Sequence, residues 1–327
     1  MIIRLRGLAI VVLTIIGLSL YLSADIFAAG SYTRAYIAMA HSNTVKVIDT
    51  QSFKVVDTLP GGKNPHGVTV SPDGKFLYLP SMFGGTDLLS VVDTEKREVV
   101  DSIKVGKASH HAAVSPDGRY LYVAVFPENE GVTVIDTQTR KVIDRIETGK
   151  KPFYLEFSPD GKMVYVMNVK SGDLTLIDAS NREVVTKLNI GQGRGHLTVT
   201  RDGKMVYITN EKTNSLIAVD GVKKEITGSI KVGRTPHGVA VTHDGKRVYV
   251  ANRGKDNLSV VDTSTLKIIG EIKVGKAPDH LSLTPDGKYL YITILSTEEI
   301  LVFDVTNNER LAVIPVGPQP HQVVFSQ

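Results

Sequence analysis

The sequence contains no cysteine among its 327 residues. Without thiols the chain cannot form disulfides, carry a lipid on an N-terminal cysteine, attach haem through a Cys-x-x-Cys-His segment or use a thiolate nucleophile. Four motifs of known chemistry are also missing: the Gly-x-Ser-x-Gly elbow, the His-Glu-x-x-His zinc motif, the P-loop and the dinucleotide fingerprint. No serine, histidine and aspartate arrangement stands out either. Their absence argues against the α/β-hydrolases, zinc proteases, P-loop nucleotidases and dinucleotide-dependent enzymes in which these motifs occur.

A concentrated charge of one sign is lacking as well. The formal net charge is +4, from 38 basic and 34 acidic side chains. The basic residues are spread along the chain and form no cluster interleaved with aromatic residues, so the sequence does not predict nucleic-acid binding.

What the chain does contain is a repeat. One tyrosine recurs at intervals of 42 to 44 residues, at Tyr36, Tyr78, Tyr122, Tyr165, Tyr207, Tyr249 and Tyr291. A Pro-Asp-Gly turn precedes it in most copies, and an aspartate follows it at Asp49, Asp93, Asp136, Asp178, Asp220, Asp262 and Asp304. Proline fixes φ, the aspartate side chain bonds to the backbone and glycine takes positive φ, so each copy contains a defined turn. Residues present in every copy are expected to be architectural.

The copy from 232 to 275 predicts four short strands, at 239–241, 247–251, 258–261 and 268–274, because these runs are rich in β-branched and aromatic residues. Four antiparallel strands in 40 to 45 residues are typical of one propeller blade.

The chain ends predict how the ring closes. The first copy starts within the repeat and supplies three strands, whereas the last ends after a single strand near 317–326. Together they make one blade, which also removes open sheet edges. We therefore expect an all-β, seven-bladed β-propeller over 31–327.

Residues 1–30 have the pattern of an export signal. Arg4 and Arg6 precede an apolar run from Leu8 to Leu22, and Ala28-Ala-Gly30 offers small residues for cleavage. An uncleaved membrane anchor is the alternative, although fifteen residues are short for a span. Either interpretation places the propeller outside the cytoplasm, in the periplasm or an equivalent compartment.

The segment Tyr249-Val-Ala-Asn252, its looser copies at 207–210 and 165–168, and the Val-Val-Asp-Thr and Ser-Pro-Asp-Gly segments resemble the YVTN β-propeller repeat family. That family is related to the haem d1 propeller of cytochrome cd1 nitrite reductase. The resemblance implies periplasmic redox systems, in which such propellers bind non-covalent haem, assist haem d1 biosynthesis or serve as cofactor-free subunits. It specifies the fold better than the function, because propellers carry unrelated sites.

Histidines are the first candidate site residues. They cluster where each blade's first strand is expected to enter the central channel, at His66, His110, His111, His196, His237, His280 and His321. Imidazole is the commonest protein ligand of transition metals and also binds haem iron, so these residues are predicted to hold haem or a metal. The alternative is that the histidine is simply the residue the repeat prefers there, bonded to a neighbouring blade. Side chains at successive strand positions also point in opposite directions, which argues against one shared site.

Departures from the repeat supply further candidates. Phe153, Tyr154 and Glu156 replace the usual small residues in one blade, and Arg194 with His196 lies in a glycine-rich segment of the next. Glu156, His196 and Arg194 are the candidate catalytic residues, with Glu156 as a general base or a metal ligand. An ion pair of Glu156 with Lys151 or Arg194 is the competing interpretation.

Two longer loops, 81–87 and 126–131, are predicted on the same face as the histidines. Insertions on one face of a repeat protein often mark its binding face. The candidate partner-binding residues are Met82, Phe83, Phe126, Glu128, Phe153, Tyr154 and Arg253.

Three functions remain open. The favoured one is an exported, non-catalytic propeller, a subunit or accessory factor of a periplasmic redox system, that binds a protein partner or a cofactor on its histidine-bearing face. The second is an enzyme, either a lactonase-like hydrolase or, from the resemblance, a dehydrogenase of a haem d1 precursor. Lactonase-type propellers would bring metal-binding Glu, Asn and Asp together, for which Glu156, Asp279, Asn168, Asn210 and Asn252 are available. The third is a purely structural surface protein.

Overall fold

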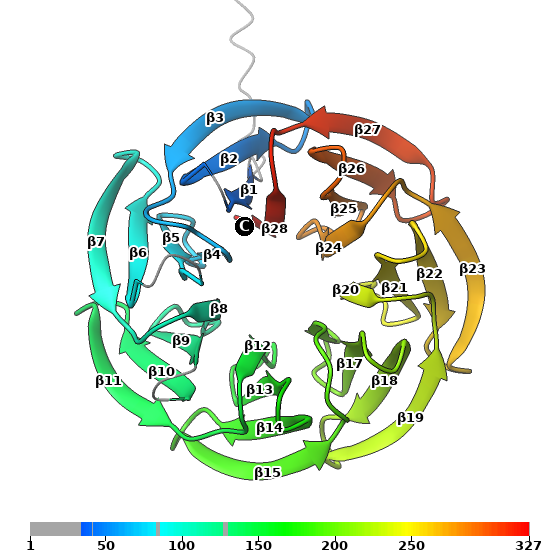
Figure 1. The fold of residues 1–327 in the computed structure, drawn as a ribbon, viewed down its shortest axis with the longest axis horizontal. Coiled ribbons are helices and arrows are strands. Elements are labelled where there is room, and N and C mark those ends of the chain that lie inside the picture. The colour runs from blue at the N-terminus through cyan, green and yellow to red at the C-terminus, as the bar shows by residue number, and fades with distance from the viewer. Residues whose placement is uncertain (1–33, 41, 83–85, 127–129, 327) are drawn as a thin grey trace, which may run out of the picture. The chain divides into compact units, whose positions relative to one another are not determined.

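In the computed structural model, residues 34–40, 42–82, 86–126 and 130–326 are described. The segment predicted as an export signal or anchor, 1–30, lies outside them. The described residues form seven four-stranded antiparallel sheets arranged as blades around a central channel (Figure 1). The predicted all-β, seven-bladed propeller is confirmed.

The blade that contains both ends of the chain consists of β1 (Arg34–Met39), β2 (Thr44–Asp49), β3 (Lys54–Pro60) and β28 (Pro320–Phe325). The next three comprise β4 (Thr69–Val70), β5 (Phe76–Leu79), β6 (Leu88–Asp93), β7 (Glu98–Lys104), β8 (Ser109–Val114), β9 (Tyr120–Val125), β10 (Gly131–Asp136), β11 (Lys141–Ile146), β12 (Pro152–Phe157), β13 (Met163–Asn168), β14 (Asp173–Asp178) and β15 (Glu183–Asn189). The last three comprise β16 (Leu197–Val199), β17 (Met205–Asn210), β18 (Ser215–Asp220), β19 (Glu225–Lys231), β20 (Pro236–Val241), β21 (Arg247–Asn252), β22 (Asn257–Asp262), β23 (Lys267–Lys273), β24 (Pro278–Leu283), β25 (Tyr289–Ile294), β26 (Glu299–Asp304) and β27 (Arg310–Pro315).

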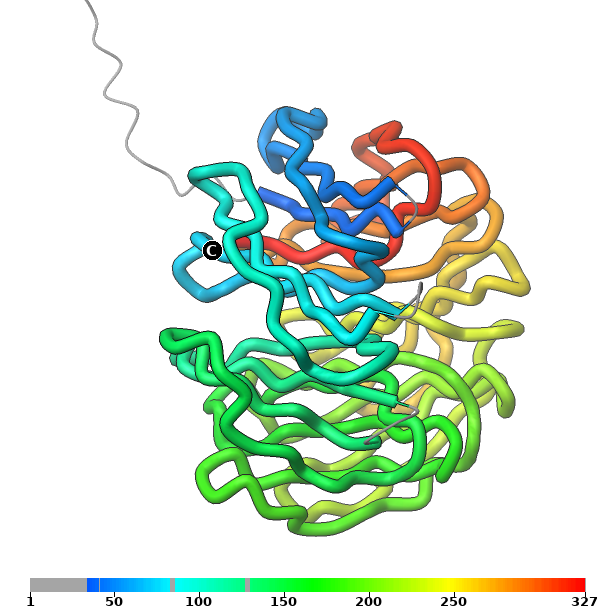
Figure 2. The backbone as a smooth tube through the Cα atoms, turned by 60° about the vertical axis from the view of Figure 1, so that its left-hand side comes forward, coloured from blue at the N-terminus to red at the C-terminus, as the bar shows by residue number. Residues whose placement is uncertain are grey.

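The ring closes as the sequence predicts. The sheet order β28-β1-β2-β3 joins the last strand of the chain to the first three, and Tyr36 pairs with Val324. The blue and red segments lie side by side in Figure 2. Because β28 completes the sheet of β1, β2 and β3, the two ends of the chain share one blade and the ring is closed.

The turns that set the blade geometry follow from their sequences. In the turn after β4, the Ser71 hydroxyl donates to the Asp73 carboxylate over 2.6 Å, and the Phe76 amide donates to Ser71 Oγ over 2.9 Å. Gly74 has φ of +72°, a conformation that glycine adopts without strain. This face of the propeller, which carries the Pro-Asp-Gly turns, is called the turn face below. The opposite face, which carries the connections into each inner strand, is called the histidine face.

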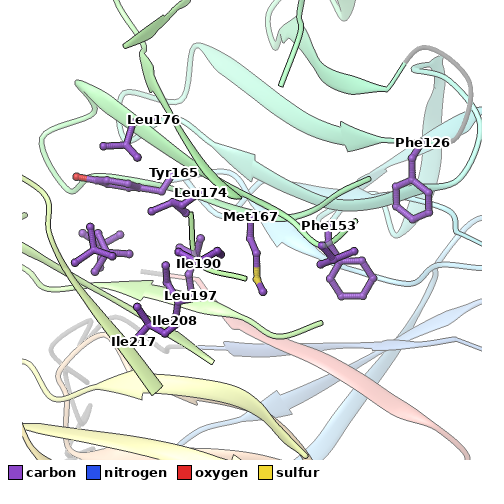
Figure 3. Packing of buried hydrophobic residues seen from close by; sticks show 14 residues of the cluster. Phe126, Phe153, Tyr165, Met167, Leu174, Leu176, Ile190, Leu197, Ile208 and Ile217 are labelled. Atoms are coloured by element: carbon purple, nitrogen blue, oxygen red, sulfur yellow. The ribbon is translucent and has the colours of Figure 1, made fainter. Parts of the chain in front are cut away.

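The core lies within and between the blades, and the seven repeat tyrosines are part of it. All seven are at most 3% exposed, as expected for an architectural residue. Figure 3 shows one cluster, in which Tyr165, Leu174 and Met167 pack with residues of the next blade such as Ile208 and Ile217. Burying one side chain of this size stabilises the fold by roughly 1.5–3 kcal/mol. The packing holds the inner strands rigidly around the channel.

Candidate functional site

The channel wall is formed by the first strand of each blade: β4, β8, β12, β16, β20, β24 and β28 (Figure 1). Short turns from the histidine face lead into these strands. The residue before the proline of the turn takes positive φ, as in Thr235 at +51° and Ala277 at +56°. This conformation turns the chain sharply, so that the next residues enter the channel.

The structure brings the seven predicted histidines together in this layer. Six of the rings form a continuous network, with centroids 4.0 Å apart for His66 and His321, 4.3 Å for His196 and His237 and 4.2 Å for His196 and His280. The His111 ring joins it through Tyr154. We call this group the histidine layer; its members are His66, His110, His111, His196, His237, His280 and His321. Strand alternation does not separate them, because the pairing register shifts where the inner strand begins, between Pro236 and Val239 and between Pro278 and Leu281.

Six imidazoles of the histidine layer are neutral at pH 7: those of His66, His110, His111, His196, His280 and His321. Burial, reinforced by the neighbouring imidazoles, lowers the pKa of His66, His196 and His280 well below its usual value. Burial also lowers the pKa of His111 and His321 to about 3. A neutral imidazole has a free lone pair, which is the form that binds a metal ion.

Four of these histidines have structural contacts with a neighbouring blade. His66 interacts with the backbone of His110, His110 with that of Phe153 and His321 with that of His66. His111 interacts with the Leu155 backbone, and its Nε2 lies 2.8 Å from Gln322 Nε2. The interpretation of the histidine as a residue that binds the neighbouring blade therefore fits this part of the layer.

His110, His111 and His321 nevertheless each keep a buried Nδ1 without a partner, and Asp279, His280 and His321 form one group of closely spaced ligand atoms. The other three histidines form a second such group. Nε2 of His196 and Nε2 of His280 are buried without a hydrogen-bond partner. One ligand atom each from His196, His237 and His280 lie within 4.8 Å of one another. Asp279, fully buried, also has an unpartnered Oδ2, which lies 3.9 Å from His280 Nε2. We call His196, His237, His280 and Asp279 the donor cluster.

A charged network supports the donor cluster. His237 Nδ1 lies 2.6 Å from Glu211 Oε1, and its Nε2 lies 3.5 Å from Asp279 Oδ1. Arg253 contacts both carboxylates, at 3.2 Å from Glu211 Oε1 and by a short contact with Asp279. Two carboxylates thus face one guanidinium. The exposed Arg194 is near enough to lower the pKa of Glu211 slightly, after the larger effects of His237 and Arg253.

Sequence reasoning did not identify Glu211. A signal was present, since Glu211 and Arg253 occupy the same position in consecutive blades, directly after Asn210 and Asn252. Opposite charges at equivalent positions of adjacent blades face each other across the blade boundary.

Glu156 lies apart from this network, in a cavity on the turn-face side of the histidine layer. The cavity has a volume of about 260 Å³ and is lined by the inner strands β12, β16, β20, β24 and β28. His280, Tyr154 and Gln322 line its inner end, and Arg201 and His243 belong to turns at its mouth. Burial raises the pKa of Glu156 to about 8. Neither Lys151 nor Arg194 forms an ion pair with it among the described residues.

The predicted partner-binding residues occupy varied positions. Phe126 and Phe153 are buried in the core (Figure 3), and Phe153 stacks on His110 with centroids 3.5 Å apart. Tyr154 lies between His111 and His196, Met82 packs against the same core cluster and Arg253 is 23% exposed. Phe83 and Glu128 lie outside the described residues. Thus only part of this set faces solvent.

The asparagines considered for a lactonase-type site use their amide nitrogens in structural hydrogen bonds, whereas Oδ1 of Asn168 and of Asn252 is buried without a partner. Asn168 Nδ2 donates to Thr175 Oγ1 over 2.8 Å, and Asn252 Nδ2 donates to Ser259 Oγ over 2.9 Å. Asn210 Nδ2 donates to the carbonyl of Ile190 over 3.2 Å. The Asn168 and Asn252 amides thus connect strands within their blades, the Asn210 amide contacts the connection from the preceding blade, and Glu156 and Asp279 lie at different levels of the channel. No helix within the described part of the chain is long and apolar enough to cross a membrane.

Solved structures confirm the fold. The propeller resembles a hydrazine synthase from Kuenenia stuttgartiensis, with a TM-score of 0.76, 23% identity and coverage of 84% of this chain and 92% of that one. It resembles a Bacteroides fragilis protein assigned as a 6-phosphogluconolactonase, with a TM-score of 0.75, 20% identity and coverage of 93% and 100%. It also resembles the dihydro-haem d1 dehydrogenase NirN, with a TM-score of 0.66, 17% identity and coverage of 89% and 74%. At these identities the likeness concerns the fold alone.

No curated protein sequence matches the chain. A family model does: the one described as lactonase, 7-bladed beta-propeller matches residues 26–315. This chain therefore belongs to the lactonase-type family of seven-bladed β-propellers.

Proposed function

We propose that this propeller binds a transition-metal ion in its channel, through Nε2 of His196, His237 and His280. The observation that carries the proposal is the pair of buried, unpartnered Nε2 atoms of His196 and His280, with Asp279 Oδ2 beside them. Buried polar atoms without partners are rare in folded proteins, because each costs about 1–3 kcal/mol. A bound cation would satisfy all three.

The spacing of the donor cluster suits a metal ion. At metal–nitrogen distances of about 2.0–2.1 Å, the ligand atoms of a tetrahedral site lie roughly 3.3 Å apart. The three histidine donors lie within 4.8 Å of one another, so small side-chain rotations close the site. Asp279 Oδ2, 3.9 Å from His280 Nε2, would supply the fourth ligand. Three imidazoles and a carboxylate suit Zn²⁺, Cu²⁺ or Ni²⁺.

The surrounding charges also favour a cation. The carboxylates of Glu211 and Asp279 lie beside the cluster, and the Arg253 guanidinium contacts both. Glu211 accepts from Nδ1 of His237, and Nε2 of that ring faces the channel side of Asp279. Carboxylates that hold metal-binding histidines in this way are a common feature of metal sites.

A metal ion fits the layer better than haem. The imidazoles of the donor cluster are at most 4% exposed, and their rings touch one another. A porphyrin would have to separate these rings before its iron reached an Nε2 atom, whereas a single ion requires only small rotations.

In this proposal the chain acts outside the cytoplasm as a binding subunit or accessory factor of a redox complex. Two features support it: the signal-like pattern of 1–30 and the buried group of imidazole ligand atoms. A hydrazine synthase chain has the same fold.

A lactonase-like hydrolase is the second candidate, favoured by the family match over 26–315. In that case Glu156 would act as the proton-transferring group, because a pKa near 8 suits general acid–base catalysis. Hydrolysis of sugar lactones that is lost in Glu156→Gln and retained in His280→Gln would favour this candidate over the metal-binding subunit.

Metal binding is tested with the purified chain after treatment with a chelator. Zn²⁺, Cu²⁺, Ni²⁺ and haem are added separately, and binding is followed by calorimetry, absorption and thermal unfolding. An ion present at a hundredfold its Kd should stabilise the fold by about 2.7 kcal/mol. We expect His196→Gln and His280→Gln to lose this effect, and His243→Ala, at the turn face, to retain it. No stabilisation by any ion, or equal stabilisation of all variants, would refute the proposal.

A further inference from the structure

The turn-side cavity contains one carboxyl in an otherwise uncharged ring. Seven equivalent residues of the inner strands each pair with a repeat tyrosine: Thr69, Ala113, Glu156, Thr198, Ala240, Ser282 and Val324. Six of them are small or neutral. Tyr154 and Glu156 lie two positions apart on the same side of β12, so both line the cavity, whereas Leu155 and Phe157 are buried in the blade.

No positive charge in the described lining balances this carboxyl. Arg201 is exposed at the mouth, where Nη2 donates to the carbonyl of Pro285 over 2.6 Å. His243 beside it has a pKa lowered by burial and by Arg201, and His280 is neutral at the inner end. The titratable side chains that line the cavity beside Glu156 are thus Tyr154, Arg201, His243 and His280. The lining residues of β28 are not titratable. A hydrogen bond with the backbone of Val199 lowers the pKa of Glu156 and so favours its ionised form, but burial has the larger effect.

The remaining lining offers hydrogen bonds. Each inner strand is the edge of its sheet, so its channel side presents backbone carbonyl and amide groups that no other strand pairs. Thr198 and Ser282 add hydroxyl oxygens. The volume of about 260 Å³ lies just below the range of drug-sized pockets, which limits the occupant to a few heavy atoms.

We propose that the turn-side cavity is a binding site for a small primary ammonium compound, whose nitrogen is held by the Glu156 carboxylate and whose apolar part lies along Val239 and Leu281. An ammonium group supplies the missing positive charge and three donors, for which the carboxylate, the hydroxyls and the carbonyls are acceptors. A hard metal ion fits less well, because Ca²⁺ takes six to eight oxygen ligands and the lining contains a single carboxylate. The cavity shares His280 with the metal site proposed above, so the two are tested under separate conditions.

The binding step exchanges a proton for the ligand's charge. The ammonium ion enters with its proton, the Glu156 carboxyl loses its own to solvent, and the pair that forms is a carboxylate with an ammonium. With a carboxyl pKa of about 8, binding at pH 7 should release about 0.9 proton per ligand.

The test is calorimetric titration of the chain at pH 7, with a chelator present, using methylammonium and n-butylammonium against n-butanol. Measurements in two buffers of different ionisation enthalpy give the number of protons released. We expect n-butylammonium to bind with proton release, n-butanol not to bind, and Glu156→Gln to weaken n-butylammonium at least tenfold. The exposed Glu95→Gln is the control that should bind normally.

The amide of Glu156→Gln has the shape of the protonated acid, so this variant should fold, and thermal unfolding checks that it does. Glu156→Asp is the second variant; it should bind n-butylammonium weakly but still release a proton. Absence of amine binding up to 10 mM (on the order of the weakest useful affinity), unchanged binding by Glu156→Gln, binding without proton release, or equal binding of n-butanol would each overturn the proposal. Because the titration contains chelator, its result is separate from that of the metal titration.

Discussion

Glu211 and His237 form a close pair across a blade boundary, with Glu211 Oε1 2.6 Å from His237 Nδ1. The Glu211 carboxylate holds Nδ1 of the ring and so directs Nε2 towards Asp279, whose Oδ1 lies 3.5 Å from it. The orientation of one side chain of the donor cluster thus depends on a residue in the neighbouring blade.

The first prediction concerns this pair. Replacing the carboxylate in Glu211→Gln should weaken Zn²⁺ binding by about 10–100-fold, because a neutral amide no longer supplies the negative charge that makes the imidazole a stronger ligand. Calorimetric titration of the native chain, Glu211→Gln and the control Glu95→Gln measures the difference. Equal affinities in all three would show that the pair has no role in metal binding.

The second prediction concerns the pH dependence that Glu156 causes. Its folded-state pKa of about 8 lies above its unfolded value, so the native chain is destabilised progressively as pH rises from about 4.5 to 8. Glu156→Gln removes this effect and should stabilise the fold above pH 8 by about 2–4 kcal/mol, with little effect below pH 4.5. Urea unfolding of the variant and of Glu95→Gln at pH 4.5, 7 and 9 measures it. A pH-independent difference would contradict the raised pKa.

Acid should destabilise the propeller through the histidine layer. The buried imidazoles have depressed pKa values in the folded state, including about 3 for His111 and His321, and take up protons on unfolding. The stability that they contribute is present above the unfolded pKa of about 6.5 and is lost as pH falls towards the folded values. The free energy of unfolding should fall as the pH is lowered from 7 to 4.5. Its pH dependence should correspond to the uptake of more than one proton on unfolding. A slope near zero in this interval would mean that the imidazoles are solvated.

Two repeat tyrosines provide a matched test of buried hydroxyl groups. The Tyr249 hydroxyl donates to Asn308 Oδ1 over 2.7 Å, whereas the buried Tyr291 hydroxyl has no partner. Tyr249→Phe should therefore destabilise the fold by about 1 kcal/mol, and Tyr291→Phe should be neutral or stabilising. Urea unfolding at pH 7 compares the two variants, and destabilisation of the same size in both would contradict the difference in hydrogen bonding.

The strands could be predicted because the same strand pattern occurs in seven copies along the sequence. The predicted strand at 247–251 is β21 (Arg247–Asn252), and 258–261 lies within β22 (Asn257–Asp262). The inner strand predicted at 239–241 is longer, because β20 begins at Pro236, ahead of the register shift. Periodicity indicates the regular part of a strand, whereas an irregular start leaves no periodic signal.

The candidate site was predictable only in part. The histidines were identified from their position in the repeat, but strict alternation placed His237 and His280 on opposite sides of their strands. The register shift at the start of the inner strand brings both into one layer. Glu211 was missed because its partner His237 lies 26 residues away in the next blade, and no local pattern joins them.

The sequence alone determined the seven blades, the closure between β1 and β28 and the histidine-rich channel, because each follows from short patterns repeated along the chain. Only the tertiary structure decided which histidine ligand atoms lie close enough together to hold one ion. It also placed Glu156 in a cavity of its own, on the other side of the histidine layer. The physical reason is that hydrogen bonding and desolvation in the channel depend on side chains from different blades, which meet only when the ring closes.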